Sequence, residues 1–138
     1  MSIQEQQELR EKYYGEAMRY MDNANGYLKN AQKDGNIYRD PKYVRTACGT
    51  AYSGVLIAME GYLILKGVTM PDKKKMRKSI DFYQKSIGLL DRKMLDYLNM
   101  AYKILHLYGY YDGIESVDVI KTGFNFANTL IEKIKPAA

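Results

Sequence analysis

Apolar residues recur at intervals of three and four along most of this chain, the spacing that places side chains on one face of an α-helix. In the first segment, about residues 4–33, the apolar stripe is Leu9, Tyr13, Ala17, Tyr20, Ala24, Tyr27 or Leu28, and Ala31. Glutamates occupy the first turns of this segment and lysines the last, which the helix dipole favours. We therefore expect one long amphipathic helix, ended by the stop signal Asp34-Gly35.

The segment from Arg45 to Lys66 is apolar on nearly every side, and it is the predicted central helix. Asp40 offers an N-cap, Pro41 fits the first helical position, and Gly67 stands where a helix-ending glycine belongs. The stripe of this helix is Val44, Ala47 or Cys48, Ala51, Val55, Ala58, Tyr62 and Leu65. We expect the other helices to cover it.

Small residues at intervals of seven, Ala47, Gly54 and Gly61, share one side of this helix. An interior glycine costs a helix about 1 kcal/mol against alanine. The expected benefit is close approach of a neighbouring helix on that side.

Residues 46–65 carry one charge, Glu60, over about the length that a membrane span requires. The run is rich in Gly, Ala, Ser and Thr and lies between amphipathic segments able to bury it, so we expect a core helix of a soluble protein. Glu60 itself has two interpretations. The simpler is a rim position or a structural pair with an arginine or a tyrosine hydroxyl, and the other is an acid that contacts a ligand in a crevice.

A third stripe runs without a slip from the middle of the chain to about residue 107, after a start at Pro71-Asp72. It comprises Met76, Ile80, Tyr83, Ile87, Leu90, Met94, Leu98, Ala101 and Leu105. A single helix over residues 73–107 would be roughly 50 Å long at 1.5 Å per residue, too long for a compact domain. We therefore predict a break at Gly88 to Asp91, with Asp91 as the N-cap of the second part.

Residues 106–115 combine glycines and aromatic residues and are predicted to form a loop. Ser116 then caps a last helix that Pro136 ends, with the stripe Val117, Ile120, Phe124, Ala127, Ile131 and Ile134. No strand pattern is present. The expected fold is all-α, one domain over residues 1–138: an antiparallel up-and-down bundle of four long helices, with the third divided so that there are five in all.

Composition agrees with one soluble domain. A chain of 138 residues can bury a sizeable core, and its net charge of 21 − 16 = +5 permits an anionic partner. The single cysteine, Cys48, fits a buried core position in a reducing compartment, and the polar, acidic N-terminal sequence does not resemble a secretory signal, so we expect a cytoplasmic protein. Fourteen tyrosines without a tryptophan suit a helical core with polar layers, or an interface.

Five cations fall within six positions at the expected start of the third helix, where the helix dipole disfavours them. They are Lys73, Lys74, Lys75, Arg77 and Lys78. Such a run is usually a solvated face, and the alternative is a site for RNA or another acidic partner.

His106 is the single histidine of the chain, and Lys103 occupies the position three before it, where a di-iron bundle needs glutamate. The sequence therefore predicts neither a metal site nor a cofactor. We interpret His106 as a polar residue at a helix end, favoured there by the dipole.

Next to His106 stands an aromatic group made of Tyr108, Tyr110 and Tyr111, followed by Asp112. These rings could stack on a base or nucleotide. The favoured alternative is that they cap the end of the bundle or form a dimer contact.

The run from Ala51-Tyr52 through Glu60 to Gly67 resembles the second helix of HEPN-type domains, and the order of elements is similar over most of the chain. That order includes the Tyr110-Tyr111-Asp112-Gly113 segment and a final helix with Phe124, Phe126 and Ala127. Many HEPN proteins are metal-independent RNases with an Arg, four to six residues, then His. Others accompany nucleotidyltransferases or bind RNA or nucleotides without catalysis.

The positions that would hold this arginine are Asn99, Met100 and Ala101, so the nuclease motif is absent. The resemblance implies a non-nuclease HEPN-like bundle, a homodimer, with a nucleotidyltransferase, RNA or a nucleotide as partner. The function we expect is a noncatalytic binding or interaction module. The alternative is an enzyme with an acid site at Glu60, or an RNase that uses His106.

Overall fold

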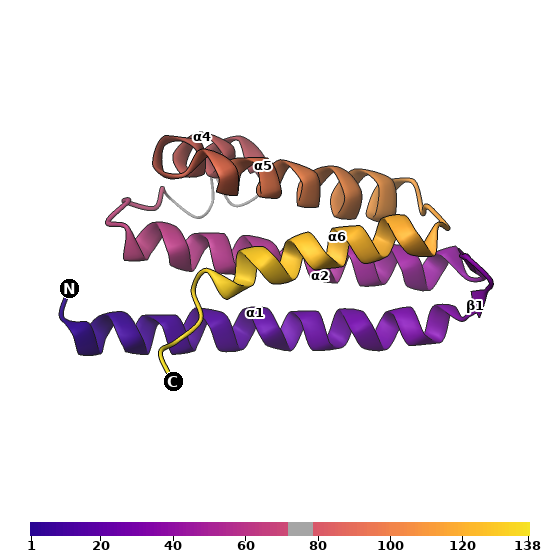
Figure 1. Ribbon diagram of the computed structural model, residues 1–138, viewed down its shortest axis with the longest axis horizontal. Helices are drawn as coiled ribbons and strands as arrows, with labels where there is room; N and C mark the ends of the chain where they lie inside the picture. The colour runs from indigo at the N-terminus through magenta and orange to yellow at the C-terminus, as the bar shows by residue number, and fades with distance from the viewer. Residues whose placement is uncertain (72–78) are drawn as a thin grey trace.

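The computed structural model describes residues 1–71 and 79–138, and these form an all-α bundle (Figure 1). The structure is 77% helical. Its described residues form five helices when the α-helix over residues 92–101 and the π-helix that continues it to residue 111 are counted as one. The predicted fold class is confirmed. Successive long helices run in opposite directions, as short connections between them require.

The first helix, α1, spans Ile3–Ala31 and begins with a capping box, in which Ser2 and Glu5 bond to each other's backbone N–H groups. It ends two residues earlier than predicted, because Gln32 adopts a φ of 55° and leaves the helix. The expected stop at Asp34-Gly35 is therefore wrong by a few residues.

The connector contains two short strands that the sequence pattern does not show, β1 (Lys33–Asp34) and β2 (Ile37–Tyr38). They pair in an antiparallel hairpin whose turn begins at Gly35, where a φ of 65° suits glycine. Tyr38 N–H donates to the carbonyl of Glu115 at 2.9 Å. Two-residue strands are too short to carry an alternating pattern, and here the hairpin ties the first connector to the start of the last helix.

The central helix, α2, spans Pro41–Leu65. Asp40 accepts a hydrogen bond from Lys42 N–H at 3.0 Å as the N-cap, as predicted. At the other end Gly67 has a φ of 79°, and the bonds from Gly67 N–H to Ile64 O and from Val68 N–H to Leu63 O form a Schellman motif. The predicted end of this helix is confirmed.

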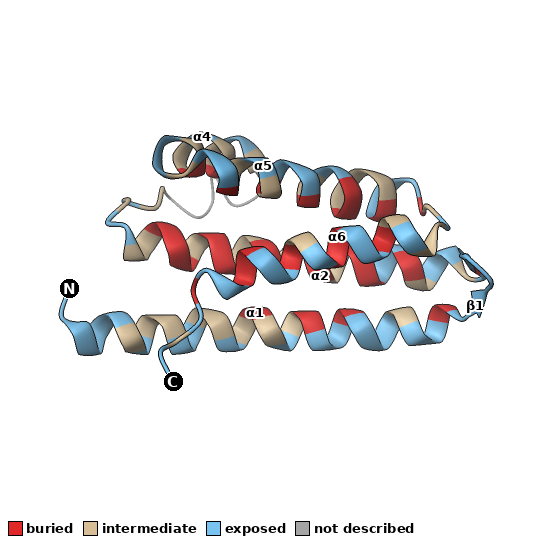
Figure 2. Ribbon diagram, viewed as in Figure 1, coloured by how far each residue is buried: buried red, intermediate tan, exposed pale blue. Residues whose placement is uncertain are grey.

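Twelve of the 25 residues of α2 are buried, and the helix lies between α1 and the remaining helices (Figure 2). The predicted glycine contact is also present. A Cβ built on Gly54 would lie 3.2 Å from the carbonyl oxygen of Ala17, and one on Gly61 would lie 2.7 Å from the Cβ of Tyr13. Glycine at these positions lets α1 and α2 pack closely along their length.

In the described part of the chain, α2 is the one helix long and apolar enough to cross a membrane, and 56% of its apolar window is buried inside the molecule. The core helix of a soluble protein has these same properties. This test alone is weak evidence for a membrane span.

The third element is divided as predicted. Helix α4 spans Ile80–Leu90 and α5 spans Arg92–Ala101, and Asp91 between them accepts a hydrogen bond from Met94 N–H at 3.0 Å. Asp72 of the predicted start at Pro71-Asp72 and the whole cation run lie outside the described residues. The π-helix η1, Tyr102–Tyr111, continues α5.

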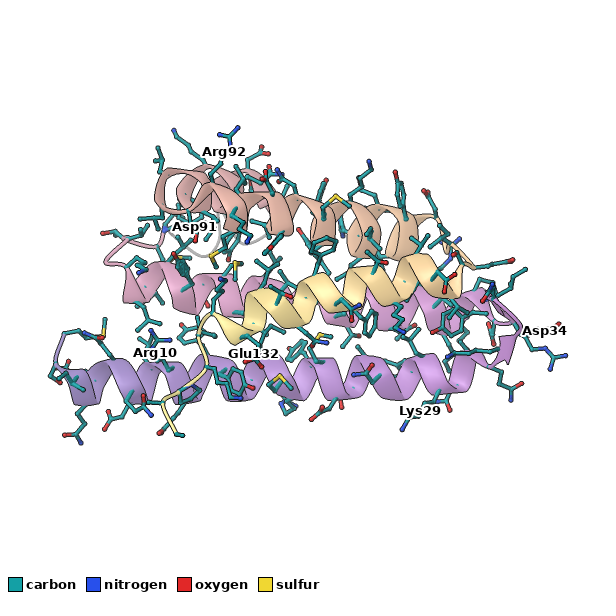
Figure 3. The ribbon with its side chains drawn as sticks, viewed as in Figure 1. Arg10, Lys29, Asp34, Asp91, Arg92 and Glu132 are labelled. Atoms are coloured by element: carbon teal, nitrogen blue, oxygen red, sulfur yellow. The ribbon has the colours of Figure 1, made fainter. Side chains whose placement is uncertain are left out.

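The last helix, α6, spans Val117–Glu132, with Ser116 as N-cap. It packs on α2, α5 and η1. The C-terminal segment returns to α1, where Arg10 Nη1 donates to the carbonyl of Lys133 at 3.3 Å (Figure 3). Among the described residues no charged side chain is buried, so charge is confined to the surface and rims of the bundle.

Candidate functional site

The segment 106–115, predicted as a loop, is helical as far as Tyr111. In a π-helix each N–H bonds to the carbonyl five residues earlier, and Asp112 N–H donates to Leu107 O at 3.0 Å in this way. Arg45 Nη1 donates to the carbonyl of Tyr111 at 2.7 Å, which places a cation at the C-terminal end of η1. π-Helical turns are rare in proteins, and those that occur are frequently part of a functional site, so η1 is a candidate for such a site.

Gly109 misled the loop prediction because its role is packing and not chain reversal. A Cβ at this position would overlap the Sγ and the Cβ of Cys48 on α2. Cys48 is fully buried, and burial raises the pKa of its thiol to about 12. The glycine lets the two helices touch, and the cysteine is the small core residue that the sequence predicts.

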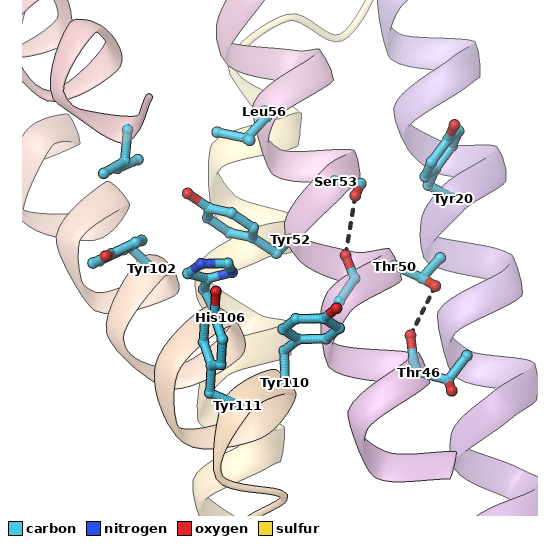
Figure 4. A pocket seen from close by; sticks show the side chains of 12 residues that line it. Tyr20, Thr46, Thr50, Tyr52, Ser53, Leu56, Tyr102, His106, Tyr110 and Tyr111 are labelled. Atoms are coloured by element: carbon cyan, nitrogen blue, oxygen red, sulfur yellow. Dashed lines mark hydrogen bonds between the residues drawn. The ribbon is translucent and has the colours of Figure 1, made fainter. Parts of the chain in front are cut away.

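A pocket of about 790 Å³ opens beside this contact, between α1, α2, the start of α4 and the α5–η1 rod (Figure 4). The side of α2 forms its floor, and rings from η1 stand on one side of that floor. The pocket is lined by Tyr20, Thr46, Gly49, Thr50, Tyr52, Ser53, Leu56, Ile80, Tyr102, His106, Tyr110 and Tyr111. Gly49 makes room for an aromatic ring, since a Cβ there would lie 2.8 Å from Cδ1 of Tyr110.

His106 stands among four tyrosine rings. Its imidazole is stacked on Tyr52, Tyr102 and Tyr110, with ring centroids 4.7, 5.4 and 5.9 Å away. Tyr111 meets it edge-on at 5.0 Å. These distances and angles are those of attractive aromatic pairs, so the rings hold one another in place and form a continuous aromatic wall.

Burial keeps His106 and Tyr52 of this wall uncharged at neutral pH. Burial lowers the pKa of His106 below its ordinary value of 6.5, which favours the neutral imidazole. Burial, followed by the nearby Tyr102 and Tyr83, raises the pKa of Tyr52 and keeps that phenol protonated. No Asp, Glu, Lys or Arg occurs among the lining residues that the structure describes.

Three hydroxyls line the floor of the pocket, and each donates its proton to the carbonyl four residues before it. Thr46 Oγ1 donates to Lys42 O at 3.0 Å, Thr50 Oγ1 to Thr46 O at 2.8 Å, and Ser53 Oγ to Gly49 O at 3.1 Å. Side chains of this kind in a helix satisfy themselves on the preceding turn. Their oxygens remain able to accept hydrogen bonds.

The structure brings together some of the predicted site residues and separates others. His106, Tyr110 and Tyr111 line the pocket, and His106 lies within η1 and not at a helix end. Tyr108 and Asp112 do not line it, and the Tyr108 ring instead lies 5.8 Å from Nζ of Lys103. A turn of π-helix directs neighbouring aromatic residues to different sides, which a loop prediction could not anticipate.

Glu60 lies outside the pocket and is half-buried. Burial raises the pKa of Tyr13 on α1, and the charge of Glu60 and a hydrogen bond to it add to the rise. Burial and then the Glu60 charge also raise the pKa of Tyr83 on α4. Glu60 is therefore near tyrosines of two neighbouring helices, which agrees with its interpretation as a rim residue paired with a tyrosine hydroxyl.

The predicted anion-binding residues Lys73, Lys74, Lys75, Arg77 and Lys78 lie outside the described residues. Within residues 1–71 and 79–138, no group of three His, Cys, Asp or Glu side chains could hold a metal ion. The described candidate site is thus an aromatic and hydroxyl pocket.

Most of the pocket was not identified from the sequence. The missed lining residues with polar or aromatic side chains are Tyr20, Thr46, Thr50, Tyr52, Ser53 and Tyr102. One signal was available, since Thr46, Thr50 and Ser53 form a polar row at helical spacing on an otherwise apolar helix. The tyrosines carry no such signal, because a tyrosine in an apolar stripe is equally a core residue.

Residues 12–136 match a family model described as a domain of unknown function, DUF5618. A solved structure, a protein of unknown function from Dyadobacter fermentans, is similar with 33% sequence identity and a TM-score of 0.77. The match covers 91% of this chain and 94% of that one. No curated protein matches the sequence.

Proposed function

Because the chain belongs to the DUF5618 family, whose description names no activity, we propose a function from the pocket itself: a noncatalytic module that binds a nucleobase of RNA or of a nucleotide. The observation that carries this proposal is the aromatic wall around His106, which borders an open pocket of about 790 Å³. Stacking on such rings is worth about 1–3 kcal/mol per base and tolerates different bases.

Exposure of the rings at the mouth supports the same function. Tyr110 and Tyr111 are 46% and 59% exposed, although each is large and apolar enough to be buried. A stacked ligand would remove these ring faces from water. Little side-chain entropy would be lost on binding, because contacts with His106 and Gly49 already fix the position of the Tyr110 ring. The site is concave, mostly aromatic and preformed, as ligand sites usually are.

The residues around His106 favour binding over catalysis. A general base or acid needs a group that orients it or shares its proton, and the described lining offers His106 tyrosine rings and no carboxylate. Glu60, the other candidate for acid–base chemistry, is separate from this pocket. An RNase that uses His106 remains the alternative, and cleavage of RNA distinguishes it.

The proposed function also includes macromolecular partners and a dimeric state. We expect a cytoplasmic, HEPN-like homodimer in which the cations between Lys73 and Lys78 meet phosphates or another acidic partner, with a nucleotidyltransferase as one candidate. The net charge of +5 supports an anionic partner. Light scattering at micromolar concentration tests the dimer, and a monomer would contradict it.

Calorimetry and NMR test base binding directly. The single histidine gives one set of imidazole signals, and a nucleoside stacked in the pocket should shift them. Tyr110→Ala should weaken binding about tenfold, as the loss of one stacking ring predicts. Tyr27→Ala is the matched control, because Tyr27 is also a partly exposed tyrosine but lies on α1 away from the pocket.

Three results would contradict the proposal. If none of the four common ribonucleosides shifts the His106 signals or releases heat, the pocket is not a base site. If Tyr27→Ala weakens binding as much as Tyr110→Ala, binding occurs elsewhere. Cleavage of RNA that His106→Ala abolishes would show that the module is an enzyme.

A further inference from the structure

The floor of the pocket carries chemistry that stacking does not use. A hydroxyl has one proton to donate and two lone pairs that accept. Thr50 and Ser53 donate that proton to the carbonyls of Thr46 and Gly49 on α2 (Figure 4). Thr46 donates its proton to the carbonyl of Lys42 in the same way. Toward the pocket they therefore present acceptors.

The three oxygens form an ordered row. Positions 46, 50 and 53 are four and three residues apart, so they share one face of α2. At 1.5 Å per residue the row is about 10 Å long. All three residues line the same pocket, which makes one wall uniform in its hydrogen-bonding sense.

The three hydroxyls are expected to keep donating to their backbone carbonyls when a ligand binds. Donating to a ligand would require each to break its bond to the preceding turn, whereas accepting from a ligand keeps that bond. A ligand group that is itself an acceptor would face oxygen lone pairs, and the described lining supplies no cation to offset them. The opposite wall differs, because neutral His106 and the tyrosine hydroxyls can both donate and accept.

Resting on the base-binding function proposed above, we infer that this pocket selects nucleobases that turn an exocyclic amino group toward α2. The amino group supplies two N–H donors to the Thr46–Thr50–Ser53 row while the ring stacks on the aromatic wall. A base of the same shape without the amino group still stacks and leaves the row unused.

Adenosine and purine riboside test this inference, since they differ by the amino group alone. Calorimetry should show adenosine binding roughly threefold to tenfold more tightly, the range expected for one net hydrogen bond. Thr50→Val should remove most of this preference by weakening adenosine binding, with little effect on purine riboside. Thr50→Ser, which keeps the hydroxyl, should retain the preference.

Thr129→Val is the matched control, because Thr129 Oγ1 makes the same bond, to Asn125 O at 3.0 Å, on an exposed part of α6. Circular dichroism of each variant verifies the helix content. Equal affinities of the two nucleosides for the wild-type chain would overturn the inference and leave base binding intact. Binding of neither nucleoside would overturn the proposed function as well, and a preference that survives Thr46→Val, Thr50→Val and Ser53→Ala together would assign recognition to another wall.

Discussion

Burial sets the charge of His106, because the described part of the pocket surrounds the imidazole with tyrosine rings and offers it no acid. The same rings hold it by stacking, with the closest centroid 4.7 Å away on Tyr52. A neutral imidazole suits a stacking wall, since a positive charge there would have to be desolvated when a ligand covers it. At the scale of residues, the charge state of His106 therefore depends on the side chains that α2 and η1 place next to it.

A pH titration of His106 follows from this. Well above pH 6.5 the histidine is neutral in both the folded and the unfolded chain, so it does not affect the free energy of unfolding. As pH falls below 6.5 the unfolded chain takes up the proton first, and stability decreases until the lowered pKa of the folded state is passed. NMR should give a pKa below 6.5, and urea unfolding should show the loss of stability as the pH falls through 6.5.

In the control variant His106→Gln this part of the pH dependence should disappear, and the rest, from carboxylates, should remain. A measured pKa at or above 6.5 would show that the tyrosine rings do not keep water from the imidazole, or that a negative charge faces it, contrary to the arrangement described.

The helices differ in how well local signals define them. Asp40, Asp91 and Ser116 are N-caps that accept the expected backbone bonds, so three helix starts agree with the sequence. Helix η1 does not agree with the sequence prediction. Gly109 resembles a helix-ending glycine in the sequence, but in the structure it allows η1 to pack against Cys48. At the scale of elements, caps act within one turn and are readable, whereas packing glycines depend on the neighbouring helix.

Two glycine-to-alanine changes should therefore have opposite effects. Gly109→Ala forces a Cβ into Cys48 and should lower the free energy of unfolding by roughly 1–3 kcal/mol, as overpacking does. Gly15→Ala lies on the exposed face of α1 with nothing within 4 Å, and should raise it by about 0.5–1 kcal/mol. Urea unfolding measures both, and a stabilising Gly109→Ala would rule out the close contact.

The whole molecule has one continuous core, in which α2 meets α1 on one side and η1 and α6 on another. Much of the core comes from the predicted stripes, and Leu98 is a fully buried member of the third stripe. The prediction is wrong for Leu90, which is 43% exposed at the end of α4. It also missed the buried residues Met21, Met59 and Leu63. Exposed apolar residues occur at the corner between α4 and α5, where Leu89 is 82% exposed. Stability at this scale should depend on the stripe positions and be insensitive to the corner.

Truncation of two leucines measures this difference. Leu98→Ala should cost about 2–5 kcal/mol because it leaves a cavity in the core, whereas Leu89→Ala should change stability by no more than about 0.5 kcal/mol. Equilibrium urea unfolding at pH 7 gives both values. Similar costs for the two variants would mean that the α4–α5 corner is covered in solution.

Periodicity and caps were sufficient to determine the helices other than η1, the central place of α2, the division at Asp91 and the buried state of Cys48, because each depends on residues within one or two turns. The tertiary structure decided the hairpin, the continuation of the third helix through Gly109, and the pocket. Of its lining, His106, Tyr110 and Tyr111 could be identified in the sequence, and Tyr102 lies four residues before His106 in the same helix, but Tyr20 and Tyr52 come from α1 and α2. They meet because helices pack across their axes, and a local sequence pattern holds no information on which side chains face one another across such a contact.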